Sequence, residues 1–348
     1  MKPLTYTLNT LAAGAALLAL WSAPAYAGES RFTVGLWGDM PYAKAKDEAA
    51  MPALLADMNG SDIAFSIYDG DIKDGSSECK DDVYAATMDM FNTLAKPVIY
   101  VPGDNEWTDC HRTNNGGFDN LERLAHIRKT MFSSVESFGR THLVLEHQGK
   151  PGETFSENTR YVKHGVMFVM LNVPGSNNNK VNGEEICKAK SARTPAQCEA
   201  DNAEWAERNV ANIQWLDQSF AKAKAGGLKG IMIVLQADMG FDVPESEKDD
   251  ESHLPERDGY APFLDALTAA TKAFAGQVLL VHGDTHFFKL DKPLANATHM
   301  LPNFTRLETF GSPNAHWVKV TVDATTRNVF RVEPMIVPGN ALKSLNAE

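Results

Sequence analysis

The sequence has no block of Lys or Arg residues and no stretch in which basic residues are interleaved with aromatic ones. Its 33 basic residues are outnumbered by 45 acidic ones, and the formal net charge is -12. Proteins that bind a nucleic-acid backbone gather cations against its phosphates. The composition therefore excludes this class of partner.

Long apolar runs are missing after the first thirty residues. The apolar stretch at residues 11–21 is itself shorter than the roughly 20 residues that cross a bilayer. Lys2 precedes this stretch and the small-residue site Ala25-Tyr26-Ala27 follows it, a pattern typical of a secretory signal. We therefore expect a signal peptide at residues 1–27 that is cleaved near Ala27, a periplasmic or secreted protein, and no membrane span.

Linkers rich in Pro, Gly or Ser and internal repeats are absent too, so residues 28–348 are expected to form one domain. Short runs of β-branched and aromatic residues alternate with helical patterns, which predicts an α/β fold. Strands are predicted at residues 31–37, 62–68, 97–101, 230–235 and 277–281, with a hairpin at 160–172. Helices are predicted at residues 44–58, 81–94, 118–132, 202–225 and 261–275, and a polar loop at 175–194.

Four Gly-Asp steps each follow directly on a predicted strand. They are Gly38-Asp39, Gly70-Asp71, Gly103-Asp104 and Gly283-Asp284, whereas random order at this composition would give about two such steps. The first three are separated by 32 and 33 residues, the length of a β-α unit. The carboxyl ends of parallel strands meet at one edge of a sheet, so we expect these carboxylates to converge there.

Converging carboxylates repel one another, and a bound cation is the ordinary way to neutralise them. His286, two residues beyond Asp284, adds a ligand of a second type on the same face of an extended turn. The alternative is that each Gly-Asp step is a turn whose Asp caps the following helix. Four such steps at strand ends favour the metal site.

At these places the sequence resembles the calcineurin-like metallophosphoesterases. Their motifs follow strands in the order Asp-x-His, Gly-Asp-x-x, Gly-Asn-His-Glu/Asp, a lone His and Gly-His-x-His. This chain has Gly38-Asp39-Met40-Pro41, Gly70-Asp71-Ile72-Lys73, Gly103-Asp104-Asn105-Glu106, Leu235-Gln236-Ala237-Asp238 and Gly283-Asp284-Thr285-His286. The resemblance runs from about Arg31 to Lys289 and implies a four-layer αββα sandwich with a metal site at the carboxyl ends of its strands.

The resemblance also implies two divalent metal ions. One would be held by Asp39, Asp71 and His286, and the other by Asp71, Asp104, Gln236 and Asp284. The second set consists of oxygen ligands alone, so Mg²⁺, Mn²⁺ or Ca²⁺ is expected rather than Zn²⁺.

One departure from the family pattern concerns the group beside the leaving oxygen. Asn105 stands where the third motif has a His, and an amide can donate a hydrogen bond but cannot act as a general acid. His111 is the nearest candidate for that catalytic role, and Arg112 beside it is a candidate clamp for the substrate phosphate. Surface residues in a polar loop are the alternative interpretation of both.

The four cysteines include no C-x₂-C pair, which disfavours a zinc site. Four cysteines allow three pairings. We favour Cys79 with Cys110, which lie in the loops after adjacent strands, and Cys187 with Cys198, which close a short local loop.

Two functions remain open. The first is a secreted enzyme that hydrolyses a small phosphate mono- or diester through a carboxylate-rich two-metal site. The second is a protein that keeps the phosphoesterase fold and binds a ligand without catalysis. A single His at places where the family pattern has five favours the second function. The replacements are Asp, Asn and Gln, which still bind cations, and this favours the enzyme.

Overall fold

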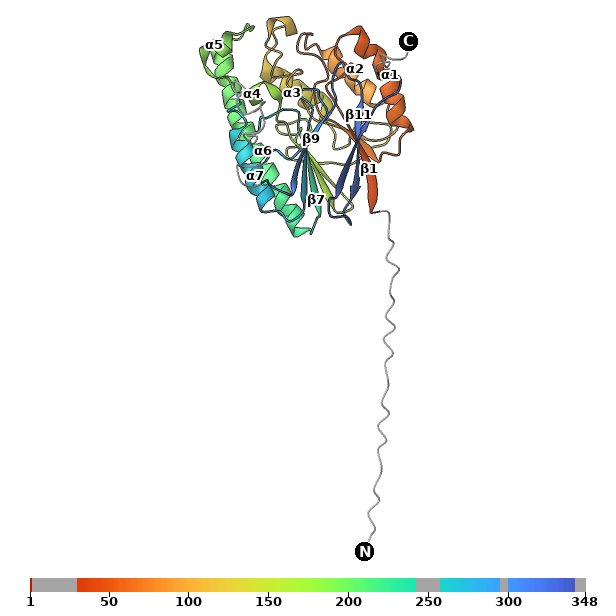
Figure 1. Cartoon of the computed structure of the whole chain (residues 1–348). Coiled ribbons are helices and arrows are strands. Elements are labelled where there is room, and N and C mark those ends of the chain that lie inside the picture. Colours follow the sequence, from red (N-terminus) through yellow and green to blue (C-terminus); the bar gives the residue numbers. More distant parts are fainter. Residues whose placement is uncertain (2–29, 242–256, 295–299, 342–348) are drawn as a thin grey trace.

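The computed structural model describes residues 30–241, 257–294 and 300–341, together with Met1. Two β-sheets pack face to face, and helices cover the outer face of each (Figure 1). The expected signal peptide and its cleavage site lie outside the described residues. Among the described residues, no helix combines the length and the apolar character that crossing a bilayer requires.

The first sheet has the strand order β12-β11-β1-β2-β3. Its strands are β1 (Arg31–Trp37), β2 (Phe65–Tyr68), β3 (Val98–Tyr100), β11 (Trp317–Asp323) and β12 (Phe330–Met335). Strands β1, β2 and β3 are parallel to one another, while β11 is antiparallel to β1. Three of the Gly-Asp steps therefore leave this sheet at the same edge.

The second sheet has the order β4-β5-β6-β7-β8-β10-β9. Its strands are β4 (Glu146–His147), β5 (Thr159–Lys163), β6 (Val166–Met170), β7 (Gly230–Val234), β8 (Gln277–His282), β9 (Lys289–Asp291) and β10 (Phe304–Glu308). Strands β6, β7, β8 and β10 are parallel. The fourth Gly-Asp step follows β8, so it belongs to the second sheet and not to the first.

Successive side chains along the strands point to opposite faces of each sheet, and together they form three apolar layers. In β6, Phe168 points to the core between the sheets, whereas Met167 and Val169 pack under the helices of the second sheet. In the first sheet, Ile67 lies between the sheets and Tyr68 lies under the helices. This period of two is what a strand buried on both faces produces. The predicted four-layer αββα arrangement is confirmed.

The helices lie close to their predicted places. Those of the first sheet are α1 (Ala45–Gly60), α2 (Asp81–Phe91) and α3 (Asn120–Met131), and those of the second are α6 (Pro195–Ala225) and α7 (Ala261–Lys272). Helix α6 begins seven residues before the predicted start, because Thr194 caps it and Gln197 completes a capping box with Pro195 at its first turn.

The segment expected to be a polar loop between β6 and α6 contains local structure. It includes α4 (Gly175–Asn178) and α5 (Gly183–Lys188), and Ser176 to Asn179 all have left-handed backbone angles. A further short helix, η1 (Thr113–Asn115), follows β3. Both predicted disulfides are confirmed: Cys79 pairs with Cys110, and Cys187 pairs with Cys198.

Candidate metal centre

The Gly-Asp steps place carboxylates where the two sheets meet. Asp39 and Asp71 both have positive φ, which turns each side chain out of its strand direction directly after β1 and β2. The glycines allow the close packing: a Cβ on Gly283 would collide with Asp39 Oδ2, and one on Gly103 would collide with Asp71 Oδ1. Gly283 and Gly103 therefore each make room for a carboxylate that a different Gly-Asp step supplies.

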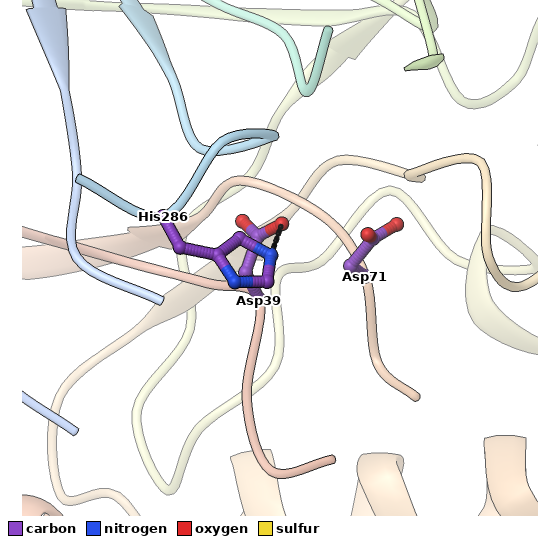
Figure 2. A group of neighbouring side chains, drawn as sticks. All are labelled: Asp39, Asp71 and His286. Carbon is purple, nitrogen blue, oxygen red and sulfur yellow. Dashed lines mark ion pairs between the residues drawn. The ribbon is translucent and has the colours of Figure 1, made fainter. Parts of the chain in front are cut away.

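Asp39, Asp71 and His286 form one group. Each offers a ligand atom, and these atoms lie within 4.8 Å of one another (Figure 2). His286 Nε2 lies 3.4 Å from Asp39 Oδ1. On the other side of the ring, His286 Nδ1 lies 2.8 Å from the carbonyl oxygen of Ser312, which can only accept, so Nδ1 carries a proton. A neutral imidazole is thereby left with its Nε2 lone pair facing the carboxylates, the tautomer that ligates a metal.

Asp39 is the least satisfied member of this group. Its side chain is fully buried, and neither carboxylate oxygen has a hydrogen-bond partner among the described residues. Burial, followed by the nearby Asp104 and Glu106 carboxylates, raises the pKa of Asp39 well above its ordinary value. A cation beside Asp39 would supply the partner that both oxygens lack.

Asp71 is buried as well, but it accepts three hydrogen bonds. Tyr42 Oη donates to Oδ2 at 3.1 Å, while Asn105 donates to Oδ1 from its backbone at 3.1 Å and to Oδ2 from its side chain at 2.6 Å. Burial and then the charges of Asp104 and Asp39 raise the pKa of Asp71. These donors fix the orientation of the carboxylate.

The donor set of this group fits a divalent cation. Two carboxylates offer hard oxygen ligands and the imidazole a borderline nitrogen ligand, and the unpartnered oxygens of Asp39 provide the structural reason for a cation. Among the described residues this is the one group of three such side chains close enough to share an ion.

The residues assigned to a second metal are arranged differently. Gln236 Nε2 donates to Asp104 Oδ1 at 3.2 Å and to Asp284 Oδ1 at 3.1 Å, and its Oε1 accepts from the backbone N–H of Gly175 at 2.5 Å. Because that N–H can only donate, the amide must present its nitrogen to the carboxylates. This set therefore does not fit a cation in the present arrangement, since a Gln donor stands between its two carboxylates.

The second carboxylate pair has further protein donors. Asp284 Oδ2 accepts from the backbone of Asp238 at 2.9 Å, and Asp104 Oδ2 accepts from Ser176 Oγ at 2.8 Å. Asp109 lies on the other side of Ser176, and burial together with the charge of Asp104 raises its pKa to about 7. The carboxylate oxygens of Asp104 and Asp284 therefore all have protein donors, whereas those of Asp39 have none among the described residues.

The predicted catalytic and substrate-binding residues occupy two places. Asn105 contacts Asp71 directly, whereas His111 and Arg112 line a cavity of about 470 Å³ whose wall also includes Asp284. His111 is 9% exposed, and burial, followed by Arg193 and Arg112, lowers its pKa to about 3. It is therefore a neutral imidazole near neutral pH, without the second N–H proton of an imidazolium ion.

The first disulfide lies under this site. The Sγ atoms of Cys79 and Cys110 are 3.5 Å and 3.7 Å from the carbonyl oxygen of Asn105, and Lys73 Nζ donates to the same oxygen at 2.7 Å. The disulfide and the buried lysine thus hold the peptide of Asn105, whose side chain contacts Asp71.

Sequence reasoning missed Tyr42. Its hydroxyl contacts Asp71 Oδ2, His286 Nε2 at 3.0 Å and Asn105 Nδ2 at 3.3 Å, so it touches two of the three group members. The only signal was its place three residues after Asp39, which says nothing about where its ring turns. Ser176 was missed for a similar reason, because its left-handed backbone brings its hydroxyl to Asp104 from a distant loop.

Comparisons with known proteins give structural likenesses only. No family model matches the chain, and no curated protein matches it. The chain is similar to GAP50, the anchor in the inner membrane complex of Plasmodium, with 10% identity over 88% of this chain and 89% of that one at a TM-score of 0.42. It is also similar to the sulfate thiohydrolase SoxB of Thermus thermophilus, with 14% identity over 84% of this chain and 43% of that one at a TM-score of 0.40. A 5'-nucleotidase from Candida albicans is similar too, with 11% identity over 87% of this chain and 50% of that one at a TM-score of 0.36. With TM-scores below 0.5, these likenesses carry no argument about function.

Proposed function

We propose that this protein is a secreted, metal-dependent phosphoesterase that hydrolyses a small phosphate mono- or diester. The observation that carries the proposal is the Asp39 carboxylate, which is fully buried without a hydrogen-bond partner beside Asp71 and His286 Nε2. The two disulfides support an oxidising compartment such as the periplasm or the cell exterior.

Asp39, Asp71 and His286 would hold the cation. A divalent metal supplies a Lewis acid for a phosphoryl oxygen and lowers the pKa of bound water. Tyr42 and Asn105 donate to Asp71 and keep this carboxylate in one orientation, so they act as positioning residues for the metal ligands. Arg112, which is partly exposed and pairs with Asp109 at 2.7 Å, is the proposed phosphate clamp.

The two-metal form of the proposal makes a further demand. Gln236 would have to turn its amide so that the oxygen faces Asp104 and Asp284, and this would break its hydrogen bond with Gly175. The number of ions is therefore a separate question from the presence of a metal.

The function is tested by adding Mg²⁺, Mn²⁺ or Ca²⁺ to the purified mature protein and measuring hydrolysis of 4-nitrophenyl phosphate and bis(4-nitrophenyl) phosphate. We expect turnover that EDTA abolishes and that Asp71→Asn reduces by at least about 100-fold, as loss of a metal ligand should. Asp89→Asn removes an exposed carboxylate and is the matched control. Turnover that persists in EDTA, or a protein that neither binds metal nor hydrolyses either ester, would overturn the proposal.

A second candidate function rests on Gln236. Its amide donates to both Asp104 and Asp284 and so joins them without a metal, although it neutralises none of their charge. This arrangement is expected of a protein that has lost one of two catalytic ions. Such a protein would bind a cation at Asp39, Asp71 and His286 and hydrolyse nothing. Metal binding without turnover of either ester would select this candidate.

A further inference from the structure

A cationic cavity adjoins the candidate metal centre. Asp39, Asp71 and His286 do not line it, but its wall includes Asp284 and Asp109, and Arg112 connects it to the neighbouring carboxylates by donating to Ser176, which in turn donates to Asp104. The volume of about 470 Å³ is in the range of small-molecule sites. The charge of Asp104 also raises the pKa of Asp39 and of Asp71, so this carboxylate links the cavity to the centre.

The charge of the wall contrasts with the charge of the whole protein. Five basic side chains line the cavity against two acidic ones, although the chain as a whole has a net charge of -12. The basic residues are Arg112, Lys180, Lys190, Arg193 and Arg257. The field of these cations is felt by His111 in the same wall, since Arg193 and Arg112 follow burial as causes of its low pKa.

Four of these five cations already have partners. The ion pairs are Arg193 with Asp201 at 2.8 Å, Lys180 with Asp258 at 2.5 Å, Arg112 with Asp109 at 2.7 Å and Arg257 with Asp238 at 3.8 Å. Lys190 is exposed and makes no ion pair with another residue in the described part of the chain. Its charge is available to a ligand, and Arg112, whose side chain is 32% exposed, can reach one as well.

Most of the wall comes from the segment between β6 and α6. Asn177, Asn179, Lys180, Val181, Ile186 and Lys190 belong to it. The Cys187–Cys198 disulfide ties this segment to the first turn of α6, so the basic side chains are presented on a fixed support. The segment predicted as a polar loop thus forms much of the wall of this cavity.

We infer that the substrate carries a second anionic group besides the reacting phosphate ester, and that this cavity binds that group; the inference rests on the proposed function. The apolar side chains of Val181, Ile186 and Tyr260 in the wall leave room for a short carbon skeleton between the two anions. A carboxylate and a second phosphate offer the same chemistry to Lys190 and Arg112, and the test separates them.

The test compares kcat/KM of the metal-loaded protein within two substrate pairs. Glycerol 3-phosphate and 3-phosphoglycerate differ by a carboxylate, and fructose 6-phosphate and fructose 1,6-bisphosphate differ by a second phosphate. We expect the member with the added anion to be preferred in at least one pair, and the pair that shows it identifies the group. Lys190→Gln should reduce that preference about fivefold, the size expected for one partly exposed charge pair.

Lys188→Gln is the matched control. Lys188 is two residues away at the end of α5, is exposed, pairs with Glu184, and does not line the cavity. This variant should leave the preference unchanged. Equal kcat/KM within both pairs, or a preference that Lys190→Gln does not alter, would overturn the inference while the proposed function stands.

A binding measurement keeps the two failures apart. Metal-free protein in EDTA is titrated calorimetrically with inorganic pyrophosphate, and we expect binding that weakens with added salt and weakens about fivefold in Lys190→Gln. Absence of turnover together with this binding would overturn the proposed function and leave an anion-binding cavity. Absence of pyrophosphate binding would overturn the cavity itself, whatever the esterase assay gives.

Discussion

Gln236 Nε2 donates a hydrogen bond of 3.2 Å to Asp104 Oδ1 and so occupies the position from which a second metal ion would have to bind that carboxylate. A Gln236→His variant would replace this donor with an imidazole whose lone pair can ligate. We expect wild-type protein loaded with Mn²⁺ to retain about one ion per chain after gel filtration, and Gln236→His to retain about two. Elemental analysis of the two proteins measures this directly.

Gln236→Leu is the control for the metal count. It removes the same hydrogen bonds but adds no ligand, so it should stay at about one ion and lose stability because Asp104 and Asp284 are left without their common donor. Two ions in the wild-type protein would contradict this prediction and would show that the amide turns when metal is present.

The Asp39 carboxylate should bind the metal ion but destabilise the metal-free folded protein. Burial and neighbouring carboxylates raise its pKa, so the ionised group is unfavourable in the metal-free protein. Asp39→Asn is therefore expected to raise the metal-free unfolding free energy by about 1 kcal/mol. It should also abolish the stabilisation that Mn²⁺ gives the wild type, about 2.7 kcal/mol at a hundredfold excess over Kd. Urea unfolding with EDTA and with Mn²⁺ measures both effects.

Asp69→Asn provides a matched comparison for Asp39. Asp69 is equally buried, its pKa is raised by burial and by Asp39, and it accepts from Thr309 at 2.8 Å, but it does not belong to the metal group. This variant should keep its full response to Mn²⁺. A response lost in Asp69→Asn and kept in Asp39→Asn would place the cation elsewhere.

The sequence could predict the carboxylates because a local rule governs them: an Asp that follows a parallel strand comes to the carboxyl edge of its sheet. It could not predict that Asp284 would leave a second sheet, or that the ring of His286 would be oriented by the carbonyl of Ser312, 26 residues away in the chain. The orientation of the Gln236 amide could not be predicted from the sequence either, because the backbone N–H of the distant Gly175 sets it.

Tyr42 is expected to matter for activity more than for stability. Tyr42→Phe leaves the ring in place but removes the hydroxyl that donates to Asp71 Oδ2 and contacts His286 Nε2. Loss of a partner that orients metal ligands costs about 10- to 100-fold in metal affinity or activity. We expect such a loss in kcat/KM with a change in Tm of less than about 3 °C, since only one hydrogen bonding group is removed. Tyr161→Phe, in the partly buried β5 strand, should change neither value.

The acid side of the stability profile should depend on Glu146. Hydrogen bonds from Arg160 and Lys222 lower the pKa of Glu146 from 4.5 to about 2. A lowered folded-state pKa gives stability that is complete above pH 4.5 and is lost as the pH falls towards 2. Because the Glu146 side chain is 45% exposed, solvent screening limits the effect to less than about 1 kcal/mol.

Urea unfolding of wild type and Glu146→Gln at pH 7, 4 and 2.5 tests this contribution. The variant should be less stable at pH 7, and the difference should shrink with falling pH. Glu184→Gln breaks only an exposed pair with Lys188 and should show a smaller, nearly constant difference. A deficit in Glu146→Gln that stays constant down to pH 2.5 would show that packing, and not charge, causes it.

The remaining misses of sequence reasoning concern chain segments whose structure depends on distant contacts. The start of α6 could have been predicted from the sequence. Thr194 and Gln197 form a capping box that can be recognised by its spacing, and Pro195 lies in the first turn. The wall formed by the segment before it was not, because the left-handed run at Ser176 to Asn179 depends on partners such as Asp104 and Arg208 that are far away in the sequence.

The two disulfides should affect different properties of the protein. Cys79→Ala/Cys110→Ala opens a loop of 31 residues, and chain entropy predicts a loss of about 4 kcal/mol, compared with about 3 kcal/mol for the 11-residue loop of Cys187 and Cys198. Because both sulfurs of the first pair contact the Asn105 carbonyl, its removal should also lower kcat for every ester. Removal of the second pair should instead lower the preference for substrates with a second anion, because it releases the wall that carries Lys190. Steady-state kinetics of both double variants, at a temperature where each is folded, measures the two effects. If both variants lost kcat and neither lost the substrate preference, the two disulfides would not have different roles.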